Sequence, residues 1–307
     1  MREAMVEVWC EAADSGVDLV VVVADSTSTA KIAPFQERHP QRVVNVGIAE
    51  QTLVGVAAGL SMGGTVTFTA NAAPFLVARA NEQVKNDICY SENAVCMVGL
   101  NAGFAYSNLG STHHAIDDIS IMRGFGSVRI LAPCDAVEAR EMFRYALEYR
   151  GPLYIRMDSA ALPLVHDATY RLRCGEPDIL REGSDCTVCA LGSVVHEACD
   201  AAAALHAEGV DVQVVNLSSI RPLSTGALLD CLCGHGPVVT VEEHGVCGGI
   251  GSLVAETIAE SGCNVLLRRL GIPQGEFARF GPRDQVRQHH QLDAAGIGAA
   301  VRLVLGA

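Results

Sequence analysis

The sequence predicts an α/β fold with two consecutive domains, each built on a mostly parallel sheet flanked by helices. β-rich runs bounded by turns alternate with helical stretches along the chain, a rhythm typical of βαβ units in parallel sheets. The chain has 307 residues, of which 50% are hydrophobic. That length allows a large buried core and favours two domains over one.

The first domain is expected over residues 1–165. Its opening, MREAMVEVWCEAADSG, reads as an amphipathic helix and lacks the features of a secretory signal. Asp135 is well placed to cap the N-terminus of the helix that follows it. The β-rich runs lie at 19–26, 43–47, 65–70, 94–100, 128–133 and 154–157, and helix candidates lie between them at 50–62, 78–89 and 136–149.

The second domain is expected over residues 186–307, after a linker at 166–185 that mixes Pro, Gly, Asp and Arg without periodicity. The motif GGIG at 248–251 precedes a helix and could cradle an anion there. It lacks the spacing of a dinucleotide fingerprint or a P-loop, so we interpret it as tight helix packing without a ligand. Strand candidates lie at 187–192, 210–217 and 237–243, and helix candidates before Gly209 and after Gly251.

Charge and hydropathy exclude several classes of partner. A formal net charge of −13 argues against nucleic acid and anionic membranes, which would repel this chain. The most apolar run, 19–24, is far shorter than the roughly 20 residues that cross a bilayer. We therefore expect a soluble cytoplasmic protein.

The twelve cysteines show no arrangement that demands a metal. Cys186 and Cys189 form a CxxC inside a predicted buried strand, and Cys231 and Cys233 are too close for a usual zinc pair. We interpret the cysteines as small buried side chains in a reducing compartment and expect no metal bound by this chain.

The segment NVGIAEQTLVGVAAGLSMGG, residues 45–64, is the most informative for chemistry. A strand ends in Gly47, and Glu50 follows near the start of a helix whose other residues are mostly small and apolar. A carboxylate in that setting is either a partner of the helix dipole or a buried functional acid. Spacing alone favours the first interpretation.

At this segment the sequence resembles the pyrimidine-binding domain of the transketolase family, whose NVGIAEQ signature is unchanged here. The resemblance extends in order over nearly the whole chain and implies a thiamine-diphosphate-binding fold followed by a transketolase C-terminal domain. The other motifs that carry it are RANEQVKND (79–87), STHHAIDDISIMRGF (111–125), APCDAVEA (132–139), GPLYIRM (151–157), NLSSIRPL (216–223) and VEEHGVCGGIGS (241–252).

The resemblance implies that this chain contacts thiamine diphosphate through three side chains. Glu50 would share a proton with N1′ of the aminopyrimidine ring, and we expect an apolar setting to raise the pKa of its carboxyl group. Phe75 would stack on the same ring, although Ala72 stands where the family often has another aromatic. Asp25 would lie close to the cofactor, with a turn-capping role as the alternative.

For the substrate, the resemblance implies that His113 contacts the hydroxyl and carbonyl groups near C2, as either a proton carrier or an oxyanion donor. His114 stands where the family usually has Gln. Arg2 and Thr29 remain of the usual phosphate-binding set.

Three family positions that recognise sugar phosphates are changed in this chain. Leu109 replaces an aspartate, Asn101 a histidine and Ala132 an arginine. We expect Asn101 to face the substrate, and we expect a non-standard donor or acceptor, such as a sulfonated, branched or unphosphorylated sugar.

The GDG motif that binds Mg²⁺ and the cofactor's diphosphate in transketolases is absent. The resemblance therefore implies a split enzyme that transfers a two-carbon ketol unit. An N-terminal partner chain would supply the Mg²⁺ site, giving an α2β2 heterotetramer. Alternatives are the β subunit of a 2-oxo-acid dehydrogenase, a deoxyxylulose-phosphate-synthase-like enzyme and a non-catalytic interaction subunit. Retention of Glu50, Phe75 and His113 argues against the last of these.

Overall fold

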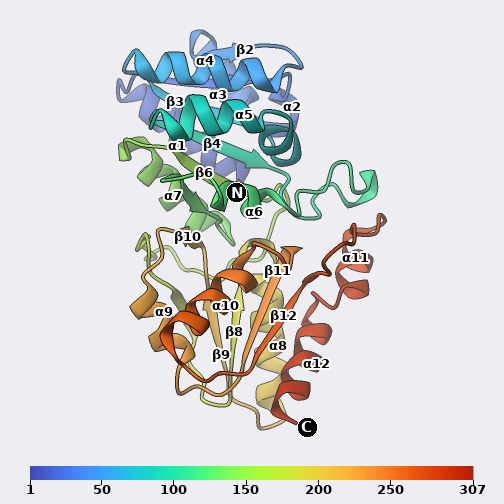
Figure 1. Ribbon diagram of the computed structural model, residues 1–307. Helices are drawn as coiled ribbons and strands as arrows, with labels where there is room; N and C mark the ends of the chain where they lie inside the picture. The colour runs from blue at the N-terminus through green and yellow to red at the C-terminus, as the bar shows by residue number, and fades with distance from the viewer. Residues whose placement is uncertain (307) are drawn as a thin grey trace. The chain divides into compact units, whose positions relative to one another are not determined.

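The computed structural model describes residues 1–306, apart from the side chain of Thr29. The chain forms two compact units, and both are α/β structures with mostly parallel sheets, as predicted (Figure 1). Unit 1 comprises Met1–Ala102 and Ile121–Leu172. Unit 2 comprises Gly103–Ser120 and the residues from Arg173 on. The predicted domains were continuous, so the assignment of 103–120 to the second unit was not foreseen.

The strands of unit 1 lie in the order β5-β6-β4-β3-β1-β2, and all of these neighbours pair in parallel. In this register Val22 of β1 pairs with Val44 on one side and Thr69 on the other. The bounds are β1 Leu19–Val23, β2 Val43–Asn45, β3 Val66–Ala72, β4 Val95–Leu100, β5 Arg129–Leu131 and β6 Leu153–Met157.

Helices cover both faces of this sheet. Because crossovers between parallel strands are right-handed, the change of direction after β2 places α3 and α4 on opposite faces. The α-helices are α1 Arg2–Asp14, α2 Thr27–Ala30, α3 Ala33–Arg38, α4 Glu50–Met62, α5 Asn81–Gln83 and α7 Ala136–Glu148, with α6 Asp118–Arg123 spanning the unit boundary. Shorter turns are η1 Pro40–Arg42 and the π-helical η2 Phe75–Arg79 and η3 Val84–Tyr90.

The core on one face of the sheet centres on Trp9 of α1, which is fully buried. Its ring lies 6.0 Å from Phe35 of α3, 5.2 Å from Phe68 of β3 and 5.9 Å from Phe143 of α7, measured between centroids. Burial of each such aromatic contributes about 1.5–3 kcal/mol. These contacts fix α1, α3 and α7 against the strands.

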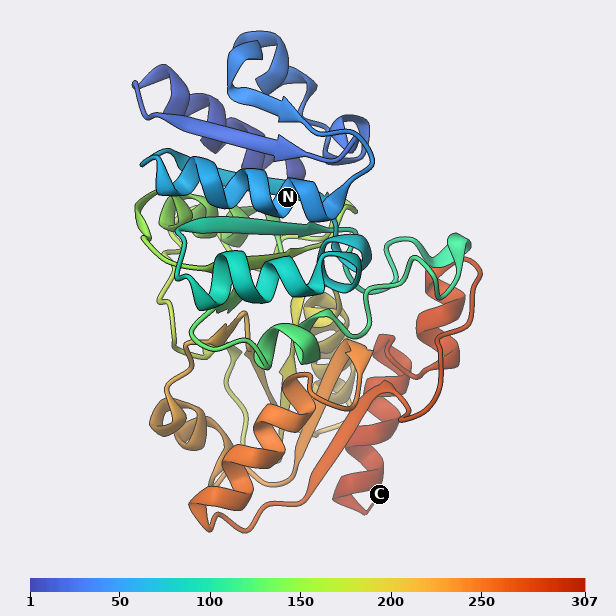
Figure 2. The ribbon, with the colours of Figure 1, turned by 45° about the horizontal axis from the view of Figure 1, so that its top comes forward.

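The sheet of unit 2 has the strand order β12-β11-β8-β9-β7, in which the β7–β9 pair is antiparallel and the others are parallel. Helix α12 runs alongside α8, and α10 packs on β11 beside α9 (Figures 1 and 2). The strands of this sheet are β7 Asp178–Arg181, β8 Cys186–Ala190, β9 Val212–Asn216, β11 Val238–Gly245 and β12 Leu267–Ile272, and β10 Ser219–Arg221 lies outside it. The helices are η4 Ser107–Leu109, η5 Gly192–Val194, α8 Val195–Ala207, α9 Thr225–Leu232, α10 Ile250–Ser261, α11 Arg283–His289 and α12 Ala294–Leu305.

The structure differs from the predicted elements at several places, of which two lie near the domain features predicted above. The predicted helix over 78–89 is a series of short turns, η2, α5 and η3. The predicted linker contains β7, a four-residue edge strand too short to show alternation in the sequence.

In the part of the chain that the structure describes, no helix has both the length and the apolar character that a membrane span requires.

Candidate functional site

The strand order reverses at β1, which has β2 on one side and β3 on the other. Ligands of open α/β sheets bind beyond the carboxyl ends of the strands at such a switch point. Ser26 follows β1, Asn71 lies near the end of β3, and Glu50 begins α4 after β2. Topology alone therefore gathers these polar residues at one edge.

Glu50 is the buried charge at this edge, with 3% exposure. Its Oε2 accepts a hydrogen bond from Arg79 Nη1 at 2.7 Å, and its Oε1 accepts one from Asn71 Nδ2 at 3.3 Å. The Ser26 hydroxyl in turn donates to Asn71 Oδ1. A carboxylate buried this way is satisfied by partners, as burial of a charge requires.

The expectation of a raised pKa for Glu50 is wrong for this structure. Burial raises the pKa of the carboxyl group, but hydrogen bonds from Arg79 and Asn71 outweigh it, so the pKa lies below the usual value. The cause is that the surroundings are polar, although the residues of α4 are mostly small and apolar. The sequence pattern predicts the helix, but it does not predict which side chains of η2 and β3 contact Glu50.

Phe75 and Arg79 lie at the two ends of the π-helical turn η2. The Arg79 guanidinium carbon lies 4.7 Å from the Phe75 ring centroid, a cation–π distance. Single π turns often occur at functional sites. Arg79 opens the RANEQVKND motif, but its pairing with Glu50 could not be read from that motif.

Asp25 lies beside this group at the end of β1. Its backbone N–H donates to Asn45 Oδ1 at 3.0 Å, and the N–H of Gly47 donates to the same oxygen at 2.9 Å. Asp25 has a φ of 55° and Gly47 a φ of 75°, so both turns use the left-handed region that suits Asp and Gly. The Asp25 side chain is exposed, and its role toward a cofactor stays a prediction.

Arg2 and Asn101 meet through Ser159 in unit 1. Arg2 Nη2 donates to the Ser159 carbonyl at 2.8 Å, and the Ser159 hydroxyl donates to Asn101 Oδ1. Asn101 is 3% exposed, and its Nδ2 is buried without a hydrogen-bond partner in the structure. A buried amide left unsatisfied costs free energy, so Asn101 is a candidate ligand-binding donor. Thr29 lies in α2, and its side chain is outside the described residues.

The two loop histidines belong to unit 2 and differ in burial. His113 is partly exposed, with Nδ1 3.0 Å from Thr112 Oγ1 and its ring edge-on to Tyr106. His114 is 3% exposed, with Nε2 3.3 Å from the Ser107 carbonyl oxygen. Burial lowers the pKa of His114, so its neutral form is favoured. His113 is the better placed of the two to meet a ligand.

The replaced positions differ in their surroundings. Leu109 is 55% exposed, whereas Ala132 is fully buried. Leu109, at the end of η4, offers an exposed apolar surface. Ala132 is buried and offers no polar side chain to a ligand.

The GGIG motif binds a carboxylate of the chain itself, that of Glu242. Glu242 accepts hydrogen bonds from the N–H groups of Ile250 and Gly251, both at 2.8 Å, at the start of α10. A Cβ on Gly249 would lie 2.1 Å from Glu242 Oε2. The motif therefore packs the chain's own carboxylate against the helix, which agrees with the interpretation of tight helix packing.

Two cysteines contradict the interpretation of all twelve as reduced side chains. Cys233, after α9, forms a disulfide with Cys263, after α10. The neighbouring helix ends bring the two Cα atoms to 6.4 Å, a proximity that their separation of 30 residues concealed.

Cys134, Asp135 and His166 form a buried group whose ligand atoms lie within 4.8 Å of one another. Asp135 caps α7, as predicted, by accepting from Glu138 N–H at 2.8 Å. Its other oxygen accepts from the N–H groups of Val165 and His166, at 3.0 and 2.9 Å. Because N–H donors fill this carboxylate, we interpret the group as structural.

Comparison with protein families identifies the chain. Residues 1–164 match the model described as "Transketolase, pyrimidine binding domain", and residues 175–297 match "Transketolase, C-terminal domain". The chain belongs to the transketolase family. Membership implies dependence on thiamine diphosphate, and the transketolase pyrimidine-binding domain is the part that contains Glu50, Phe75 and Asp25.

Separately encoded transketolase subunits match the chain along nearly its whole length. One subunit of the apulose-4-phosphate transketolase of Actinobacillus succinogenes is 53% identical, and the match covers 97% of this chain and 96% of that subunit. The 6-deoxy-6-sulfo-D-fructose transketolase subunit SqwH of Clostridium sp. is 33% identical over 99% and 94%, respectively. A solved split-gene transketolase, described as an inactive β4 tetramer, superposes with a TM-score of 0.88 at 35% identity, covering 99% and 97%.

Proposed function

We propose that this chain is the catalytic C-terminal subunit of a two-chain transketolase, in which Glu50 is the acid that contacts the aminopyrimidine ring of thiamine diphosphate. The observation that carries the proposal is the buried carboxylate of Glu50 at the sheet switch point, bonded to Asn71 and linked to Phe75 through Arg79. An aminopyrimidine offers ring nitrogens, an amino group and a flat face. A carboxyl group, an amide and an aromatic ring suit these features.

Thiamine diphosphate, when bound, supplies the carbanion chemistry of ketol transfer. Glu50 would hold a proton at N1′ of the ring, which requires the carboxylic acid form. Arg79 opposes that form by stabilising the carboxylate. The Arg79 side chain is 49% exposed, so it has room to leave Glu50 when a ring nitrogen takes its place.

His113 would act on the substrate by donating to, or moving a proton at, the oxygen atoms near C2. The contact between its Nδ1 and Thr112 Oγ1 orients the imidazole ring. An oriented imidazole is the commonest group for such proton transfers. Arg2 and Asn101 would contact more distant substrate atoms.

We also propose that an N-terminal partner chain binds the diphosphate through Mg²⁺ and completes an α2β2 heterotetramer. Two observations support a partner: the GDG motif is absent from this sequence, and full-length relatives are named as subunits. For the substrate we propose apulose 4-phosphate or a related non-standard ketose, on the name of the 53% identical relative. The changes at Leu109, Asn101 and Ala132 support this choice.

Reconstitution tests the proposal. The chain is mixed with the product of an adjacent reading frame that carries a GDG motif, together with thiamine diphosphate and Mg²⁺. Ketol transfer is then assayed with apulose 4-phosphate, sulfonated ketoses and xylulose 5-phosphate. Transfer from a ketose to an aldose supports the proposal. Formation of deoxyxylulose phosphate from pyruvate, or oxidative decarboxylation of a 2-oxo acid, would instead identify one of the rival enzymes.

A further inference from the structure

Residues 103–116, here named the histidine loop, lie within unit 2. The two stems of the loop pair with each other: Gly103 and Ala115 exchange backbone hydrogen bonds of 3.0 and 3.2 Å. His113 lies between these stems. The position of its imidazole therefore depends on what holds the stems.

The carboxyl end of β11 holds both stems. Glu243 Oε2 accepts from the N–H of Phe104 at 2.9 Å, and the N–H of Gly245 donates to the Ile116 carbonyl at 2.7 Å. The two anchors are two residues apart on one strand. The strand therefore sets the orientation of the loop as a whole.

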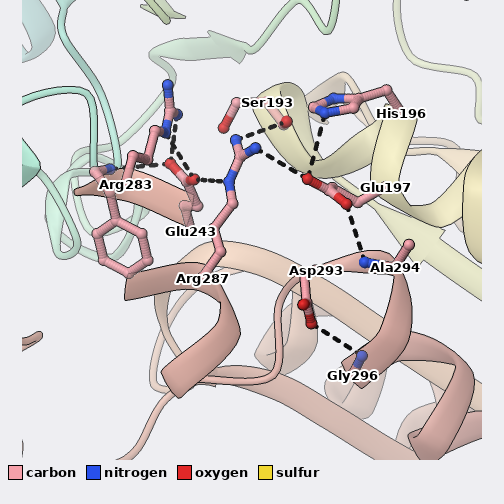
Figure 3. Close-up of polar contacts among 10 residues, drawn as sticks. Ser193, His196, Glu197, Glu243, Arg283, Arg287, Asp293, Ala294 and Gly296 are labelled. Atoms are coloured by element: carbon pink, nitrogen blue, oxygen red, sulfur yellow. Dashed lines mark hydrogen bonds and ion pairs between the residues drawn. The ribbon is translucent and has the colours of Figure 1, made fainter. Parts of the chain in front are cut away.

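Glu243 is itself held by two arginines of α11 (Figure 3). Arg283 binds it with Nε to Oε1 at 3.1 Å and Nη2 to Oε2 at 2.7 Å, and Arg287 Nε binds Oε1 at 2.6 Å. Arg287 also donates to the Ser193 carbonyl at 3.0 Å and to Glu197 Oε1 at 3.2 Å. The carboxylate thus accepts from three directions and has little freedom to rotate.

Stability alone does not account for a charge at this place. Glu243 is 1% exposed, and well-packed apolar residues often stabilise a core as much as a buried ion network does. Burial raises the pKa of its carboxyl group, but Arg283 and Arg287 hold it well below the usual range. Glu243 therefore stays a charged acceptor for the Phe104 N–H at all ordinary pH values.

Gly103 shows how closely the loop approaches this carboxylate. Its φ is 60°, and a Cβ there would lie 2.4 Å from Glu243 Oε2. Only glycine combines that backbone conformation with that approach. The backbone and the ion cluster are therefore fitted to each other at the loop stem.

We propose that Glu243, locked by Arg283 and Arg287, is a positioning residue that sets the conformation of the histidine loop and thereby the place of His113. The catalytic meaning of this role rests on the proposed function. The placement of the loop does not, so the two can be tested separately.

Hydrogen–deuterium exchange on the full chain, alone and in the reconstituted pair, tests the placement. The variants are Arg283→Met, which removes the bidentate contact with Glu243, and Arg283→Lys, which keeps the positive charge. Glu243→Gln keeps the shape and removes the charge. The matched control is Arg302→Met, which breaks an exposed two-pronged pair with Glu208, at 3.0 and 2.6 Å, in the same unit.

We expect exchange of the histidine-loop amides to speed up about 10- to 100-fold in Arg283→Met, because a charge-assisted contact is lost. Arg283→Lys should restore part of the protection, and Arg302→Met should leave the loop unchanged. Loop exchange equal to that of the wild type in both Arg283→Met and Glu243→Gln would overturn the proposal. Faster exchange spread evenly over unit 2 would also overturn it, since it would indicate a purely structural cluster.

Kinetics separate the two hypotheses. If the positioning role and the proposed function are both correct, kcat/KM for the ketose falls about 10- to 100-fold in Arg283→Met, because small misplacements of catalytic groups slow the reaction. The KM for thiamine diphosphate stays unchanged, because the residues proposed to contact its ring lie in unit 1. A wild-type pair without ketol transfer would overturn the proposed function while the exchange result still stands. Normal transfer with unchanged loop exchange would overturn only the positioning role.

Discussion

Arg79 contacts both side chains that the family resemblance assigns to the aminopyrimidine ring. Its Nη1 donates to Glu50 Oε2 at 2.7 Å, and its guanidinium lies over the Phe75 ring at 4.7 Å. One cation therefore occupies the position between the proposed acid and the proposed stacking surface. The charge state of Glu50 is set by this neighbour as much as by burial.

Arg79→Met should move the pH dependence of the reconstituted enzyme. The pKa of Glu50 is lowered in this structure, so removing the donor raises it and favours the acid form at higher pH. We expect the pH profile of kcat/KM for thiamine diphosphate, which reports groups of the cofactor-free pair, to shift upward in pH at the limb set by Glu50. Arg140→Met, which breaks a pair with Glu7 in the same unit, is the control. An unmoved profile would show that Arg79 does not set the ionisation of Glu50.

Asp135 should make stability depend on pH in acid. Burial raises the pKa of its carboxyl group, but hydrogen bonds from the His166 side chain and from the backbone of Glu138, His166 and Val165 lower it to about 2. Because the folded-state pKa is lowered, the stabilisation is present above the unfolded pKa, about 3.9, and is lost as pH falls toward 2. Asp135→Asn should cost about 2 kcal/mol of unfolding free energy near neutral pH. Urea unfolding from pH 6 to 2 measures it, and a cost that persists undiminished at pH 2 would contradict this account.

The substrate should not be an ordinary transketolase sugar. Each charge-assisted contact absent at Leu109, Asn101 or Ala132 is worth roughly 1.5–3 kcal/mol, or about one to two decades in affinity. We expect kcat/KM for xylulose 5-phosphate to lie well below that for apulose 4-phosphate. Asn101→His, which restores the common family residue, should narrow the difference. Equal specificity constants for the two ketoses would remove the basis for a specialised substrate.

The chain without its partner should bind thiamine diphosphate weakly and show no turnover, because no GDG motif supplies the Mg²⁺–diphosphate contacts. Titration calorimetry with and without Mg²⁺ measures this. Tight, Mg²⁺-dependent binding by the chain alone would refute the two-chain arrangement.

Much of the fold follows from sequence pattern, because strands such as β1 are apolar runs bounded by turns and helices such as α7 are amphipathic with a clear N-cap. The predicted elements do not include helices α2, α3, α6, α9, α11 and α12 or strands β10 and β12. Most of these elements are too short to show a clear period in the sequence. Residues 103–120 belong to the second unit because of contacts such as that between Glu243 and Phe104. These two residues are 139 positions apart in the sequence, so local sequence pattern does not indicate their contact.

The candidate site divides in the same way. Glu50, Phe75 and His113 could be named because motifs surround them. Arg79 and Ser159 could not, because their roles come from where η2 and the segment after β6 bring them. The expectation of a raised pKa for Glu50 fails because the pKa depends on Arg79, a side chain 29 residues away in the sequence.

The ketol-transfer rate of the reconstituted pair carrying Glu50→Gln tests the central claim most directly. The amide keeps the size of the side chain and cannot hold the carboxyl proton at N1′. We predict a fall in kcat of about 10²–10⁴-fold, the usual range for a general acid–base group, with a thermal unfolding midpoint close to that of the wild type. Near-wild-type kcat at ordinary thiamine diphosphate concentrations would show that Glu50 is a helix-end carboxylate and would contradict the account.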